Sequence, residues 1–378
     1  MKETQAIPNV EASLGSDRDA GSDTRVGISR RTYLRRSLMG GAALAGSGAL
    51  DFFDTFTTMS VAHAQGSSFS FAWVSDTHLY PKTLNTRFVD KATRAFKEVA
   101  GMGDKLDFMI FGGDLAQLGD PVEIALGADL LKEVKIKKYF IPGEHDWYLD
   151  MGATWNKTFG AAPWKFDHKG VRFIGLDTVG NAPDYWTAKK MTPKERMDHM
   201  SALDGSQAGP WAGIGKKQMQ WLQTALSDWS KDAPVIVFTH TPVYEVYPLW
   251  NFWTRDWREA QEVLKPFKNV TNIHGHVHQP LYNEIGNMRF IGQLATSWPW
   301  PYPPTGVPEL TKPMIRVDPG DPFDGVGWGL VNFAGGKVDQ QYKKWRKQVF
   351  AVAEVDSGTG DNRNQILQPR IADRDWNY

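Results

Sequence analysis

Short runs of apolar residues alternate along the chain with segments whose apolar residues recur at helical spacing. The apolar runs are typical of buried strands. They lie near 69–74, 106–111, 138–142, 171–176, 234–239 and 270–274. Helical periodicity covers 86–102, 121–134 and 215–229. This alternation predicts an α/β fold with a sheet at its centre.

The end of the pattern is more irregular. Two short alternating strands are expected at 281–285 and 288–292, and a closing hairpin has Gly335-Gly336 at its turn. Residues 180–213 lack clear periodicity and are expected to be an insertion, while 298–323 form a loop rich in Pro and Trp. We therefore predict one domain over 65–345, followed by a C-terminal extension at 346–378.

The first 64 residues have a different character. A polar stretch leads to Ser29-Arg30-Arg31-Thr32-Tyr33-Leu34, then to a mildly apolar region, then to Ala62-His63-Ala64. A charged region, an apolar region and a small-residue cleavage site are typical of an export signal, and the paired arginines resemble a twin-arginine signal. We predict a disordered leader with a signal peptide at 1–64. An uncleaved membrane anchor and a basic tail joined to an ordinary amphipathic helix are the alternatives.

Export would make the protein bacterial and periplasmic or secreted, with the twin-arginine export machinery as a partner. No stretch after the leader reaches the roughly 20 apolar residues that a membrane helix needs, so the mature chain is expected to have no stable membrane span. Lys and Arg number 43, as do Asp and Glu, which gives no sign of a nucleic-acid-binding surface. The absence of cysteine excludes disulfides, zinc–thiolate sites, iron–sulfur clusters and cysteine nucleophiles.

Polar side chains follow the predicted strands, where an α/β sheet places its ligands. They include five of the nine histidines. The set is Asp76, His78, Asp114, Glu144, His145, His240, His276 and His278. Carboxylate oxygens mixed with imidazoles suit Mn, Fe or Zn.

The order and spacing of these residues resemble the calcineurin-like metallophosphoesterases over 69–292. The matching blocks are Asp76-x-His78, Gly112-Gly113-Asp114, Gly143-Glu144-His145-Asp146, His240 and Gly275-His276-Val277-His278. The resemblance implies a four-layer αββα sandwich of two mixed β-sheets flanked by helices, with 65–345 as the catalytic domain. It also implies hydrolysis of a phosphomonoester or phosphodiester by attack of a metal-bridging hydroxide.

The resemblance further implies a role for each residue. Asp114 would bridge two divalent metal ions. Asp76, His78 and His278 would complete the first metal site, and Glu144, His240 and His276 the second. His145 would stabilise charge on the phosphate or protonate the leaving oxygen, and Asp146 would orient the His145 ring.

One position departs from the family, which usually has Asn where this chain has Glu144. With three ionised carboxylates, two dications keep a net charge of +1 rather than +2, so a dianionic monoester should bind less strongly than in the family. This tilts the expectation toward phosphodiesters, and a trivalent iron in one site would restore charge. The purple acid phosphatase branch has Tyr at the position of Gln117, so we expect no tyrosinate–iron site.

Two alternatives stay open. Glu144 could leave a metal- or ligand-binding protein with weak or lost hydrolase activity, and the Trp-rich loops could bind carbohydrate. Aromatic residues near the predicted ligands are candidates for substrate binding, although they could equally fill the core. The candidates are Tyr244, Trp250 and Trp298.

Overall fold

The computed structural model describes residues 67–180, 192, 195, 210–246, 252–298, 326–345 and 375–377. The chain divides into two units, and all of these residues belong to the unit Phe52–Tyr378. The predicted leader lies outside the described residues. So do most of the predicted insertion, of the Pro- and Trp-rich loop and of the C-terminal extension.

The first sheet has the strand order β12-β11-β10-β1-β2-β3. Its parallel part consists of β1 (Ser68–Val74), β2 (Phe108–Phe111) and β3 (Lys137–Phe140). Its antiparallel part consists of β10 (Gly327–Ala334), β11 (Lys337–Lys344) and β12 (Asp375–Asn377). The C-terminal extension therefore contributes an edge strand.

The second sheet has the order β4-β5-β6-β7-β9-β8. Four parallel strands form its centre, namely β5 (Val171–Gly175), β6 (Val235–Thr239), β7 (Val270–His274) and β9 (Met288–Gly292). The antiparallel strands β4 (Trp164–His168) and β8 (Leu281–Ile285) close its edges. Every residue of β6 and β7 is buried, as expected for strands covered on both faces.

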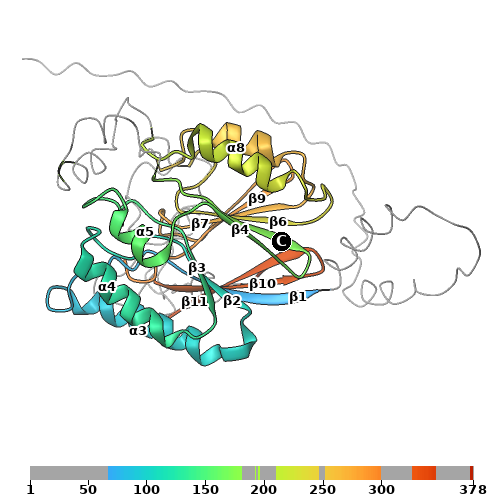
Figure 1. The fold of residues 1–378 in the computed structure, drawn as a ribbon. Helices are drawn as coiled ribbons and strands as arrows, with labels where there is room; N and C mark the ends of the chain where they lie inside the picture. The colour runs from blue at the N-terminus through green and yellow to red at the C-terminus, as the bar shows by residue number, and fades with distance from the viewer. Residues whose placement is uncertain are drawn as a thin grey trace, which may run out of the picture. The chain divides into compact units, whose positions relative to one another are not determined.

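Three hydrophobic clusters separate four layers (Figure 1). The first joins the first sheet to α3 (Thr86–Met102), α4 (Pro121–Leu130) and α5 (Ala153–Phe159). The second fills the space between the sheets with rings such as Phe71, Phe173 and Phe238. The third packs α8 (Gly215–Leu226) and α9 (Trp257–Leu264) on the second sheet. The predicted αββα sandwich of two mixed sheets is thus confirmed.

The helix boundaries follow from their capping residues. Asn85 accepts a hydrogen bond from the Phe88 N–H at the start of α3, and this helix has the predicted limits. Asp120 and Glu123 form a capping box around Pro121 at the start of α4. The α-helix ends at Leu130 rather than at the predicted 134, because a short 3₁₀ turn takes over the last residues.

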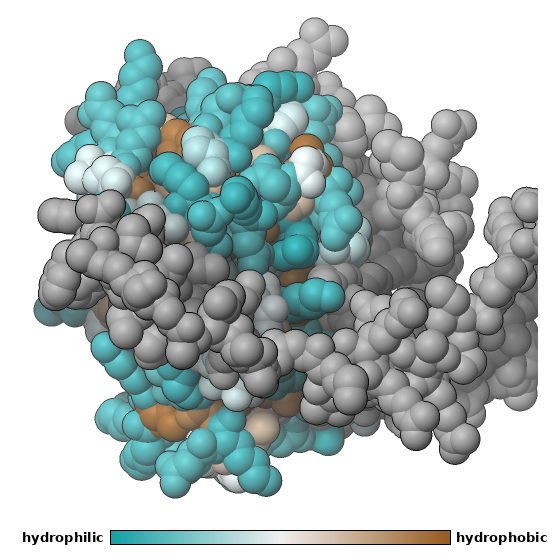
Figure 2. Space-filling view, turned by 90° about the vertical axis from the view of Figure 1, so that its right-hand side faces the viewer, coloured by the Kyte–Doolittle hydropathy of each residue, from teal (hydrophilic) through white to brown (hydrophobic). Residues whose placement is uncertain are grey.

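The sequence did not predict β4, α5 or α9. Strand β4 has no fully buried residue, and the two helices have 7 and 8 residues, too few for a clear period. On the face seen in Figure 2, the described surface is mainly hydrophilic, and hydrophobic residues form small separate areas. Among the described residues no helix combines the length and apolarity needed to span a membrane.

Candidate metal centre and active site

The site begins where β1 and β2 end, because the segments that follow these two strands continue side by side beyond the sheet. The Asp76 N–H donates to the Gly113 carbonyl at 2.9 Å, and the His78 N–H donates to the Asp114 carbonyl at 3.0 Å. These bonds prolong the parallel pairing by a few residues. They bring Asp76, His78 and Asp114 to one place.

The backbone of this region adopts unusual conformations. Seven non-glycine residues in the described part of the chain have positive φ, and five of them are predicted metal ligands. These five are Asp76, His78, Asp114, His276 and His278. Positive φ is unfavourable for residues that have a Cβ, and such conformations are concentrated at functional sites. The fold therefore maintains strained turns where the polar side chains converge.

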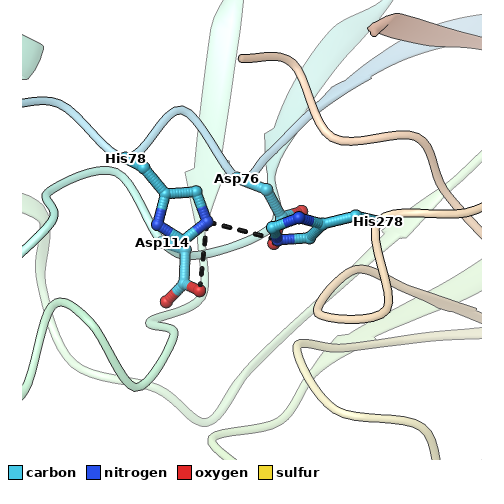
Figure 3. Close-up of side chains that lie close together, drawn as sticks. All are labelled: Asp76, His78, Asp114 and His278. Atoms are coloured by element: carbon cyan, nitrogen blue, oxygen red, sulfur yellow. Dashed lines mark hydrogen bonds and ion pairs between the residues drawn. The ribbon is translucent and has the colours of Figure 1, made fainter. Parts of the chain in front are cut away.

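The first group consists of Asp76, His78, Asp114 and His278, all buried (Figure 3). His78 Nε2 lies 3.2 Å from His278 Nε2 and 3.7 Å from Asp114 Oδ2. His278 Nε2 also lies 3.1 Å from Asp76 Oδ1. One donor atom from each residue lies within 4.8 Å of all the others, so a single cation could be held among them.

The second group consists of Asp114, Glu144, His240 and His276, and it shares Asp114 with the first. His240 Nε2 lies 3.3 Å from Asp114 Oδ2 and 2.9 Å from Glu144 Oε2. His276 Nδ1 lies 2.8 Å from Glu144 Oε1. The two groups contain the same residues as the two predicted ligand sets, with Asp114 common to both.

The metal-donor atoms of the second group are better placed to bind a cation than to hydrogen-bond to one another. Glu144 Oε2 and His240 Nε2 are buried and close, yet neither makes a hydrogen bond of acceptable geometry within the described part of the chain. Two carboxylates and two imidazoles per group form a donor set suited to Mn, Fe or Zn. The residues present therefore fit a pair of metal ions.

Outer contacts fix two of the imidazole rings. His240 Nδ1 lies 2.7 Å from the Gly112 carbonyl, which can only accept, so in the neutral ring Nδ1 carries the hydrogen and Nε2 presents its lone pair toward Asp114 and Glu144. His78 Nδ1 lies 3.0 Å from Gln117 Oε1. Gln117 is thus an outer contact of a predicted metal-binding histidine.

The electrostatics of the second group favour positive charge. Burial alone would raise the pKa of Glu144, but His276 and His240 outweigh burial and hold that pKa well below its usual range. Burial would lower the pKa of His240, but Asp114 and Glu144 raise it well above its usual value. Carboxylates that stay ionised and attract protons onto their neighbours are also suited to bind cations.

Close packing explains one of the glycines. A Cβ on Gly143 would lie 2.1 Å from Asp114 Oδ1 and 2.5 Å from the Asp114 nitrogen. Any larger residue there would displace the aspartate that both groups share.

His145 lies beside the first group, and its ring centre is 4.6 Å from that of His78. Its Nδ1 lies 2.7 Å from the Gln117 carbonyl. The orienting role expected for Asp146 is wrong. The Asp146 carboxylate accepts hydrogen bonds from the backbone N–H groups of Asp114, Ala116 and Gly143 at 2.9–3.0 Å.

Asp146 therefore supports the turn that carries Asp114, and Gln117 holds the His145 ring. Burial and the nearby Asp114 raise the pKa of Asp146 well above its usual value. The resemblance implied a contact between Asp146 and the His145 ring, whereas in this chain the Asp146 carboxylate contacts backbone N–H groups.

The predicted substrate-binding aromatics have three different outcomes. The Trp298 ring lies over the first group, 4.8 Å from the His78 ring and 5.9 Å from that of His278. Tyr244 is wrong as a site residue, because it is buried in the cluster beneath α8 and α9 and packs on Phe290. Trp250 lies outside the described residues.

The sequence missed two aromatic residues beside the second group. Phe252 and Trp211 lie against the His276 ring at 5.0 and 5.8 Å. Phe252 belongs to a run of aromatic residues after His240, at positions 244, 247, 250, 252, 253 and 257. The run itself does not show which member faces the site. Trp211 lies within the segment 180–213, which lacks clear periodicity, so no local signal pointed to it.

Comparison with known proteins gives one family. The calcineurin-like phosphoesterase family matches residues 69–280, which is more than half of the 378 residues. The chain is also similar to the 3',5'-cyclic adenosine monophosphate phosphodiesterase CpdA of Haemophilus influenzae, with 23% identity over 234 residues, 59% of this chain and 74% of that protein.

Solved structures similar to the chain include two phosphatases. A dimetal phosphatase from Danio rerio is similar with a TM-score of 0.51 and 13% identity, over 72% of this chain and 95% of that one. The purple acid phosphatase PPD1 from yellow lupin, Lupinus luteus, has a TM-score of 0.48 and 13% identity, over 74% of this chain and 52% of that one. At this identity the Danio rerio structure bears on the fold alone.

Proposed function

Because the chain belongs to the calcineurin-like phosphoesterase family and is a metal-dependent phosphoric ester hydrolase, we propose that it cleaves phosphodiesters at the two groups joined by Asp114. The observation that carries this proposal is the pair of buried four-residue groups with one shared carboxylate. Two cations held by a common carboxylate would lie close enough to act on one phosphate.

Each group would hold one metal ion, with Asp114 between the two. When bound, such a pair neutralises phosphate oxygens and lowers the pKa of a water between them. The chain's own contribution is to orient the ligands. The Gly112 carbonyl fixes His240 and the Gln117 side chain fixes His78, and strained turns hold Asp76 and Asp114 in place.

His145 would act on the substrate rather than on a metal. Its Nδ1–H donates to the Gln117 carbonyl, so Nε2 remains for a phosphate oxygen or for the leaving oxygen. A protonated His145 at that position could transfer its Nε2 proton to the departing alkoxide.

Three observations support a diester over a monoester. Asp76, Asp114 and Glu144 place three carboxylates in the two groups, so two dications would keep a net charge of only +1. A diester carries one negative charge where a monoester carries up to two. Trp298 lies beside His78 and His278 and could contact an apolar substituent. The Haemophilus influenzae relative is named a cyclic nucleotide phosphodiesterase.

The test measures metal content and turnover on one sample. The purified chain would be loaded with Mn²⁺, Fe²⁺ or Zn²⁺ in parallel and compared on bis(p-nitrophenyl) phosphate and p-nitrophenyl phosphate. We expect about two metal ions per chain and a higher kcat/KM for the diester, and the same sample after chelation is the control. Faster hydrolysis of p-nitrophenyl phosphate than of bis(p-nitrophenyl) phosphate would contradict the proposed preference for diesters. Bound metal without turnover of any ester would support the alternative of a metal-binding protein that lost hydrolysis through Glu144.

We also propose that the chain is exported through the twin-arginine pathway to the periplasm or the medium. Support comes from Arg30 and Arg31 within their motif and from the small residues Ala62 and Ala64 at the predicted cleavage site. Replacing both arginines by lysine should retain the protein inside the cell, as measured by fractionation. Unchanged export of that variant would contradict the proposal.

A further inference from the structure

Gln117 contacts two histidines of the site through two different oxygens. Its side-chain Oε1 lies 3.0 Å from His78 Nδ1, and its backbone carbonyl lies 2.7 Å from His145 Nδ1. Gln117 is only 7% exposed. A predicted metal ligand and the predicted proton donor therefore depend on the same residue.

The segment that carries Gln117 is fixed on both sides. The Gln117 N–H donates to the Leu79 carbonyl at 3.0 Å. On one side, Asp146 accepts from the N–H groups of Asp114 and Ala116. On the other, Glu123 accepts from the N–H of Leu118 at 2.8 Å and from that of Asp120 at 3.3 Å.

Two buried carboxylates thus hold alternate N–H groups from residue 114 to residue 120. The backbone cannot move easily to compensate for a change in the Gln117 side chain.

The chemistry of an amide oxygen decides which ring nitrogen of His78 carries the proton. An amide oxygen only accepts, so Nδ1 keeps its hydrogen and Nε2 presents a lone pair. Nε2 is the atom that lies 3.7 Å from Asp114 Oδ2 and 3.2 Å from His278 Nε2, inside the first group. The tautomer that Gln117 selects is therefore the one that can bind a cation there.

We propose that Gln117 is a positioning residue for the first metal site, which its side chain prepares by holding the Nδ1–H tautomer and ring orientation of His78. This inference rests on the proposed function, since it assumes that the first group binds a metal ion. The Gln117 carbonyl also orients the His145 ring. The distance and orientation of His145 relative to the first metal site are therefore fixed by the same residue.

The test compares three substitutions of buried glutamines. Gln117→Met removes the acceptor at similar volume, and Gln117→Glu keeps an acceptor oxygen. Gln261→Met is the matched control, because Gln261 is also 7% exposed and its Nε2 donates to the Val243 carbonyl, a contact between α9 and the loop after β6. All three would be titrated with Mn²⁺ after chelation, with elemental analysis of the loaded proteins.

Gln117→Met should weaken binding of one of two metal equivalents by about 10- to 100-fold, the usual effect of losing an outer hydrogen bond to a metal-binding histidine. Gln117→Glu should restore that affinity to within a fewfold of the unaltered chain, and Gln261→Met should leave both equivalents unchanged. Equal metal affinities in Gln117→Met and Gln261→Met would overturn the inference.

A second readout separates this inference from the proposed function. Long-range ¹H–¹⁵N spectra of the histidine rings, recorded on the chelated full chain, should show His78 as the Nδ1–H tautomer and a change of tautomer in Gln117→Met. An Nε2–H tautomer in the unaltered chain would overturn the inference whether or not metal binds. If the unaltered chain binds no metal while His78 is in the Nδ1–H form, the proposed function and the role of Gln117 at a metal site are overturned. Gln117 would then determine only the tautomer and orientation of the His78 ring.

Discussion

Strand β2 has an aspartate just before it and another shortly after it, and the two serve opposite purposes. Asp107, before the strand, is paired: its carboxylate lies 2.7 Å from Lys169 Nζ and 2.8 Å from His168 Nε2, and it accepts from the Ser70 N–H. Asp114, after the strand, lies among carboxylates and imidazoles and has positive φ. At the end with Asp107, ion pairs and a hydrogen bond stabilise the fold. At the end with Asp114, carboxylates of like charge lie close together and the surrounding structure must hold them there.

The contrast extends beyond the two aspartates. At the end with Asp107, charges are partly exposed and matched by opposite charges, which adds modest stability. At the end with Asp114, the carboxylates of Asp76, Asp114 and Glu144 are buried together. A fourth buried carboxylate, that of Asp146, accepts hydrogen bonds from the backbone N–H groups of Asp114 and Gly143 and so holds the turns that carry these residues. Such an arrangement costs stability unless cations join it, as is common at functional sites. Matched substitutions at the two ends should therefore separate function from stability.

The largest effect is expected from Asp114→Asn. Asn tolerates positive φ better than most residues, so the turn should persist while both groups lose their shared charge. We expect metal content to fall at both sites and kcat/KM to drop by roughly 10³-fold or more, because several kcal/mol of charge stabilisation is lost. Elemental analysis and diester turnover measure this. Asp107→Asn is the matched control and should keep metal and activity; loss of only one metal in Asp114→Asn would contradict the shared position.

His145→Gln should have the next largest effect. The ring lies beside the first group but contacts the Gln117 carbonyl rather than a ligand position. We expect kcat to fall by about 10²-fold or more, as for loss of a general acid, with metal content unchanged. His168→Gln, at the opposite end of the sandwich, is the control and should retain full turnover. A parallel loss of metal in His145→Gln would show that this histidine belongs to the metal centre.

Glu144→Asn should have a smaller effect, confined to one group. Its two oxygens face His240 and His276, so the second cation should bind at least about tenfold more weakly, because a close charge pair is worth about 1 to 4 kcal/mol. The higher net charge of the loaded centre should also raise the rate for a monoester relative to a diester. Metal titration and paired assays on both esters test this. Unchanged metal affinity and an unchanged ratio of rates would remove Glu144 from the ligand set.

The sequence was sufficient where local rules decide the outcome. Strands β8 and β9 have the predicted limits, and α3 begins after the cap at Asn85 as its spacing indicated. The polar side chains at the predicted strand ends could be expected to lie together, because parallel strands place their carboxyl ends at one edge of a sheet. Their division into two ligand groups came from the resemblance to the calcineurin-like metallophosphoesterases.

The sequence was insufficient where distant backbone decides the contact. The resemblance assigned Asp146 to the His145 ring, but the three N–H groups that donate to the Asp146 carboxylate belong to residues 114, 116 and 143. Tyr244 lies in an aromatic run whose members face both the site and the core, and nothing in the run separates them. Gln117 was noted only for not being tyrosine, because its contacts with two histidines depend on how the turns after β1 and β2 align.

The smallest effect is expected from Asp107→Asn, and it concerns stability alone. Burial would raise the pKa of Asp107, but Lys169, the Ser70 N–H and His168 outweigh burial and lower it. A carboxyl whose pKa is lower in the folded chain stabilises the fold above its unfolded pKa of about 3.9. That contribution is lost as the pH falls through the folded value.

We therefore expect Asp107→Asn to lower the free energy of unfolding by about 1 kcal/mol at pH 7, the upper end of the range for partly exposed ion pairs. The difference from the unaltered chain should narrow below about pH 4, where Asp107 becomes protonated first in the unfolded chain and, at lower pH, in the folded chain as well. Urea unfolding of both chelated proteins at several pH values measures this. A difference that stays constant down to pH 3 would mean that Asp107 acts through shape rather than charge, and the contrast between the two ends of β2 would then not be electrostatic.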